Sequence, residues 1–129
     1  MSIKHFVLPP DYTDWSLDQE EFVAALHQRW RVRKICTTYD DPNIHFSLDW
    51  SLWMDDSRLL VGLMDREGKA VALEADLRDS AAFALWFRSL VPEEQELLFC
   101  NESYSGSIKL TGETTEQQIV DAIPQAAQT

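Results

Sequence analysis

The chain of 129 residues has few glycines and no long apolar run, and each shortage excludes a class of protein. Its glycines, Gly62, Gly68, Gly106 and Gly112, are scattered. No glycine-rich loop can therefore hold a phosphate, which excludes the usual nucleotide-dependent enzymes. No apolar run approaches the ~18 residues of a membrane span, and the N-terminus lacks the apolar stretch of a signal peptide. We therefore expect a cytoplasmic protein that does not bind membranes.

Cysteine and histidine are also scarce, which argues against disulfides and metal sites. Cys36 and Cys100 lie far apart and form no Cys-x-x-Cys pair, so free thiols in a reducing compartment are expected. The three histidines have no ligand spacing. Acidic pairs at 40–41 and 55–56 lie at opposite ends of one predicted strand and do not follow an EF-hand pattern. We expect no metal and no cofactor.

Positive charge is the third shortage. The chain has 11 Lys and Arg against 22 Asp and Glu, a net charge of −11. Such a field repels phosphate backbones, so we expect no nucleic acid partner. It favours a basic protein partner, although solubility alone also explains it. Hydrophobic residues make up 45% of the chain and aromatics 11%, which excludes disorder for most of its length.

Hydrophobic periodicity predicts a single domain over residues 1–129 with the element order β-α-β-β-β-β-α-β-β-α. The predicted strands are 3–8, 32–39, 43–54, 59–64, 71–75, 97–100 and 105–110, and the predicted helices are 16–29, 79–91 and 114–123. Ser16 with Gln19 and Thr114 with Gln117 have capping-box spacing, and Asp79 is expected to cap the second helix.

The fold class expected from this order is α+β, a two-layer sandwich of a mainly antiparallel sheet and three helices. Strand 59–64 is apolar on both faces, which indicates a central strand. In element order, size and acidity the chain resembles the secretion-chaperone architecture. Such an analogy does not by itself carry function.

The strand at 43–54 alternates strictly between apolar and other residues. We expect its even-numbered side chains to be buried, from Ile44 and Phe46 to Leu48 and Trp50. His45, Ser47 and Asp49 should then face away from the core. These residue types suggest a catalytic triad, but serine stands in the middle, where a triad needs histidine. We therefore assign no catalytic residue.

Four residues are candidates for contact with a partner: Trp53 on the polar face of this strand, Trp15 in a loop, His45 and Asp49. The basic cluster Arg29, Arg31, Arg33 and Lys34 has two interpretations. It complements a helix C-terminus, or it contacts an acidic ligand or a subunit.

The function predicted from the sequence is a non-enzymatic acidic domain that binds another protein, either as an immunity or inhibitor-like partner or as a chaperone. The interface is expected in a homodimer or a hetero-complex. The alternative is a small hydrolase whose site is assembled across elements, for instance from His45 with Glu102 or Tyr104.

Overall fold

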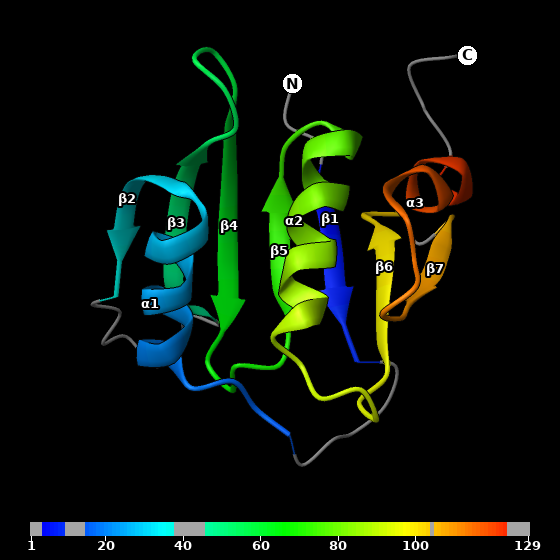
Figure 1. Ribbon diagram of the computed structural model, residues 1–129, viewed down its shortest axis with the longest axis horizontal. Helices are drawn as coiled ribbons and strands as arrows, with labels where there is room; N and C mark the ends of the chain where they lie inside the picture. The colour runs from blue at the N-terminus through cyan, green and yellow to red at the C-terminus, as the bar shows by residue number, and fades with distance from the viewer. Residues whose placement is uncertain (1–3, 10–14, 38–45, 104, 124–129) are drawn as a thin grey trace.

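The computed structural model describes residues 4–9, 15–37, 46–103 and 105–123 (Figure 1). These form an α+β domain with the predicted element order. The strands are β1 (Lys4–Leu8), β2 (Arg31–Cys36), β3 (Phe46–Trp53), β4 (Leu59–Asp65), β5 (Val71–Glu74), β6 (Leu97–Asn101) and β7 (Ser107–Leu110). The helices are α1 (Gln19–Arg29), α2 (Leu77–Ser89) and α3 (Glu116–Ala122). The predictions for Ile3, Ile44 and His45 lie outside the described residues.

The strands form one seven-stranded sheet in the order β2-β3-β4-β5-β1-β6-β7. Every neighbouring pair is antiparallel, as expected from the short connections. Strands β2 to β5 form a meander, and β6 and β7 form a hairpin. Strand β1 lies between β5 and β6 and is antiparallel to both, so β5 and β6 run parallel to each other with α2 as their connection.

The helices lie on one face of the sheet, α1 over the β2–β4 side and α2 over its centre, with α3 beside the β6–β7 end (Figure 1). Alternate residues of each strand point into the layer between sheet and helices, as the pleat requires. In β3 these are Leu48, Trp50 and Leu52, all at most 1% exposed. The predicted burial of Leu48 and Trp50 is therefore confirmed, whereas Phe46 is only half-buried.

The helices begin at different residues from those predicted, because other side chains accept the free N–H groups of each first turn. Asp18, not Ser16, caps α1 by accepting from the Glu21 N–H. Asp76 caps α2 by accepting from the Asp79 N–H, which leaves the Asp79 carboxylate to an arginine.

Helix α3 is capped by Thr115 in a capping box with Gln118, one residue after the predicted pair. The Thr114 hydroxyl instead accepts from the backbone N–H of Thr111 at 2.8 Å. The motif was correctly predicted, but its position was wrong by one residue.

Trp50 connects the sheet to both long helices. Its indole packs edge-on against Phe22 of α1, with ring centroids 5.1 Å apart, and stacks on Phe83 of α2 at 5.7 Å. Gly62 lies directly opposite Trp50 on β4. A Cβ atom there would be 2.2 Å from the indole, so only glycine leaves room for the ring.

We predict that Gly62→Ala destabilises the protein by about 1–3 kcal/mol, because the buried indole cannot move away from the added methyl group. The measurement is urea unfolding of the variant beside the wild type. Gly112→Ala is the matched control, since a Cβ atom at Gly112 meets no atom within 4 Å. Equal stability of the two variants would contradict the role assigned to Gly62.

Candidate functional site

The face of the sheet opposite the helices carries apolar side chains, and no described helix or strand covers it. Residues paired directly across neighbouring strands point to the same face, so the strand register identifies the members of this face. The apolar ones are Phe6, Leu8, Cys36, Phe46, Trp53, Leu59, Val61, Leu63, Ala72, Leu98 and Cys100. We call this surface the open face.

The most exposed apolar part of the open face lies on β3 and β4. Trp53 pairs with Leu59, and Val61 and Leu63 follow along β4. Leu59 and Val61 are each 37% exposed, and they are the exposed large hydrophobic side chains among the described residues. We call Trp53, Leu59, Val61 and Leu63 the open-face patch.

The open-face patch corrects the interpretation of strand 59–64. The strand is central, as predicted, because β4 lies between β3 and β5. However, its second apolar face is not covered by any other described element. The apolar residues at alternate positions of β4 therefore face outward, and such contiguous exposed apolar surface is typical of interaction sites.

Two of the predicted partner-contact residues, Trp53 and Asp49, lie on this face. Trp53 is half-buried, and the guanidinium of Arg31 lies 5.9 Å from its ring centroid. Asp49 is also half-buried and pairs with Leu63. Trp15 instead packs against the core between sheet and helices, and His45 lies outside the described residues. The structure thus brings two of the four residues onto one surface.

Positive charge borders the open-face patch on edge strand β2. Arg31 pairs with Trp53 and Lys34 with Ser51, so both lie on the open face. A β-bulge separates Val32 from Lys34, and the Arg33 guanidinium reaches the Ser51 hydroxyl at 3.5 Å. We call Arg31, Arg33 and Lys34 the basic rim.

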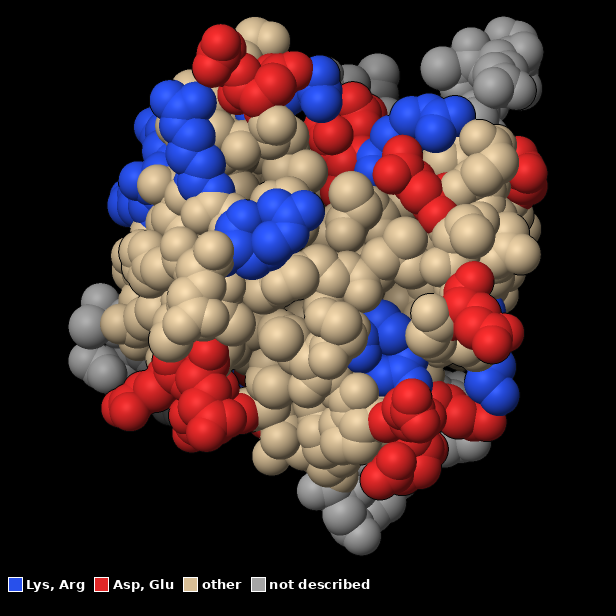
Figure 2. Space-filling view, in the orientation of Figure 1, with Lys and Arg blue, Asp and Glu red and all other residues tan. Residues whose placement is uncertain are grey.

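The basic rim is largely unneutralised in a chain with twice as many acidic as basic residues. Arg31 forms one exposed ion pair with Asp56, at 3.3 Å. Arg33 and Lys34 form no ion pair with any of the described residues. On the helix-covered side, Figure 2 shows acidic side chains at several corners, and Lys and Arg gathered above the end of α1 and β2.

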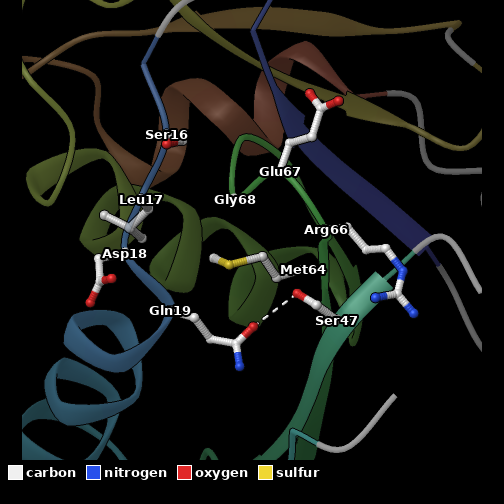
Figure 3. Close-up of a pocket in the computed structure, with 9 residues that line it drawn as sticks. All are labelled: Ser16, Leu17, Asp18, Gln19, Ser47, Met64, Arg66, Glu67 and Gly68. Atoms are coloured by element: carbon white, nitrogen blue, oxygen red, sulfur yellow. Dashed lines mark hydrogen bonds between the residues drawn. The ribbon is translucent and has the colours of Figure 1, made fainter. Parts of the chain in front are cut away.

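Ser47 departs from the prediction that it faces away from the helices. The register of β3 with β4 shifts between Phe46 and Leu48. Such an irregularity changes the direction in which the Ser47 side chain points. The Ser47 hydroxyl donates to the Gln19 side-chain oxygen of α1 at 2.9 Å (Figure 3). It therefore belongs to a different surface from Asp49.

Ser47 lines a hollow of about 360 Å³ beside the start of α1 (Figure 3). Ser16, Leu17, Asp18, Gln19, Met64, Arg66, Glu67 and Gly68 form the rest of its wall. A nucleophilic serine needs an adjacent base, and the partner of Ser47 here is an amide. No histidine is among the described residues that line the hollow, so they do not form a serine–histidine pair.

A serine and a histidine do meet elsewhere, between β1 and α2. The distance between His5 Nδ1 and Ser80 Oγ is 2.8 Å, within the range of a nucleophile–base pair. However, His5 is 2% exposed and Ser80 is 0% exposed. No substrate can reach either group, so this pair is structural. Burial lowers the pKa of His5, against a smaller opposing effect from Asp76.

Arg58 joins the β3–β4 turn to the start of α2. Its guanidinium donates to both carboxylate oxygens of Asp79, at 2.9 and 3.2 Å, and also pairs with Asp55. The Asp79 hydrogen bond and charge raise the pKa of Arg58. The backbone N–H of Ser57 is the main cause of the lowered pKa of Asp55. These groups satisfy one another and offer no free acid or base.

Two further reactive groups, Cys100 and Arg88, are inaccessible or already hydrogen-bonded. Burial raises the pKa of the Cys100 thiol, which makes it a poor nucleophile. Arg88 is buried, and its guanidinium donates to the backbone carbonyls of Leu110, Val91 and Glu93 rather than facing an open anion site. Glu102 is exposed in a turn, whereas its proposed partners His45 and Tyr104 lie outside the described residues.

Within the described ranges, no group of three or more His, Cys, Asp and Glu residues could hold a metal ion. The described helices are all too short to span a bilayer. Compared with known protein families, curated proteins and solved structures, the chain has no significant match. The open face is therefore characterised by its own geometry alone.

We predict that the free energy of unfolding falls as pH drops below about 6.5, the ordinary pKa of histidine. Since the pKa of His5 is lowered in the folded state, the unfolded chain binds the proton first, and protonation favours unfolding. One such group contributes at most about 1.4 kcal/mol per pH unit. The measurement is urea unfolding at about pH 7.5 and 5.5.

The control for this prediction is His5→Asn, which keeps a polar group beside Ser80 and cannot titrate. Its stability should change less between the two pH values than that of the wild type. An equally large loss in both proteins would assign the effect to other groups.

Proposed function

We propose that this chain is a non-enzymatic domain that binds another protein through the open face of its sheet. The main observation behind the proposal is that the helices cover only one face of the sheet. Helices bury one face, whereas the described part of the other carries an apolar patch with Trp53 at its edge. Aromatic residues are enriched at the cores of protein interfaces.

A second support is that the serine and histidine side chains described above are either buried or bonded to a group that is not a base. Ser80 and His5 are sealed from solvent, and the Ser47 hydroxyl has an amide partner. Interface formation, in contrast, needs only exposed apolar area with a polar border, and the open face has both. An immunity or inhibitor-like role and a chaperone-like role both fit such a surface.

The occupant of the open face is a second protein or a second copy of this chain. A stable interface buries at least ~1,000 Å² in total, which would require more of the open face than the open-face patch alone. The net charge of −11 favours approach of a partner with positive net charge. A homodimer must overcome the same charge, so it needs the apolar contact to dominate.

We predict that Trp53→Ala and Val61→Asp weaken association, each by about 1 kcal/mol or more if the open-face patch is central to the interface. Two measurements test this: sedimentation of the pure protein at micromolar concentration, and capture of partners from its native cell extract with identification by mass spectrometry. Leu85→Ala is the control, since Leu85 is half-buried on the helix side of the core.

A protein that sediments as a monomer and retains no partner sensitive to Trp53 or Val61 would contradict the proposal. Loss of association in Leu85→Ala to the same extent would also count against it, because the effect would then follow stability and not the open face.

A further inference from the structure

At the described strand positions of the open face, basic residues outnumber acidic ones, the reverse of the whole chain. Of the 11 basic residues, the strand positions of this face hold Lys4, Arg31, Arg33, Lys34 and Lys109. Of the 22 acidic residues, the described positions there hold Asp49, Asp65 and Glu74. The described strand positions of the open face thus hold more basic than acidic residues, in contrast to the chain as a whole.

The acidic residues of the open face are mostly engaged within the protein. Glu74 lies 3.8 Å from the Lys4 ammonium, and the Asp65 carboxylate accepts from the backbone N–H groups of Lys69 and Ala70. In contrast, Arg33 and Lys34 have no carboxylate partner among the described residues. Among the described residues of this face, the cations that lack a carboxylate partner therefore lie together at the basic rim.

We propose that the open-face patch and the basic rim together bind an extended segment of a partner protein in which a short apolar stretch is followed by acidic residues. This inference rests on the proposed function and adds the chemistry of the segment. Its apolar side chains lie on Trp53, Leu59 and Val61, and its carboxylates face Arg33 and Lys34. An arginine pairs with a carboxylate through two parallel hydrogen bonds, which fixes the register of the segment.

The net charge of −11 does not oppose this local preference. At physiological ionic strength charges are screened beyond about 8 Å. The basic rim therefore attracts the residues that contact it directly, whereas the net charge affects the rate at which a whole partner approaches. The segment lies across the face and does not extend the sheet, because the bulge between Val32 and Lys34 interrupts the regular ladder that strand addition at β2 needs.

Positively charged edge strands also have a simpler role, since lysine and arginine on an edge prevent edge-to-edge aggregation. The two roles make different predictions. A protective charge needs no ligand, and its removal increases self-association. A binding charge selects acidic over basic ligands, and its removal weakens that selection.

The test uses NMR titration of the full chain with two synthetic peptides, one joining a short leucine stretch to glutamates and the other joining the same stretch to lysines. We expect the glutamate peptide to shift the amides of β2, β3 and β4, and the lysine peptide to leave them unchanged. Raising salt from about 0.05 M to 0.5 M should weaken the glutamate complex, because rim charges are screened.

The variant is Arg33→Ser with Lys34→Ser, which should weaken binding of the glutamate peptide by about three- to tenfold. Its control is Arg66→Ser with Arg78→Ser, which changes the net charge equally but removes exposed residues of the β4–β5 hairpin and of α2. Binding by the control should match the wild type.

Three results would overturn the inference: no shift with the glutamate peptide, equal shifts with both peptides, or displacement of the glutamate peptide by single-stranded DNA at equal charge. If the variant self-associates and the wild type binds neither peptide, the rim only protects the edge. A partner that depends on Trp53 in the extract experiment, with no binding of the glutamate peptide, would leave the proposed function standing and reject the acidic segment alone.

Discussion

The contact between the Trp50 indole and the backbone at Gly62 determines where both long helices lie. The ring lies across β4 because residue 62 has no side chain, and its two outer contacts are Phe22 of α1 and Phe83 of α2. Phe22 also lies close to Trp86 and Phe87 of α2. One aromatic cluster therefore binds the sheet, the first helix and the second helix together.

The period-two pattern predicted the inner face of β3 because alternation is a local property of a strand. Leu48 and Trp50 are buried as expected. The same pattern in β4 could not tell a face covered by a second layer from one left open, since both read as apolar. Whether a face of the sheet is covered depends on how many helices the chain has and on which side of the sheet each helix lies. Both depend on the whole chain and not on the residues of one strand.

The predicted cap of α2 and several of the predicted site residues failed where a distant partner intervenes. Asp79 has the sequence context of a cap, but Arg58, 21 residues earlier, takes its carboxylate. His5 and Ser80 are 75 residues apart, and no spacing rule connects them. The shift of register at Ser47 likewise has no signal in the strict alternation around it. The basic cluster was visible in sequence, but its position beside Trp53 required the register of β2 with β3.

The position of β1 between β5 and β6 has a consequence for how the sheet is assembled. The meander β2–β5 consists of near neighbours in sequence and needs only short loops to close. Strands β6 and β7 can join that meander only through β1, the earliest of the strands in chain order. Closing so long a loop is entropically unfavourable and slows folding. During synthesis one edge of β1 therefore stays unpaired until β6 emerges, and β6 in turn supplies the edge to which β7 is added.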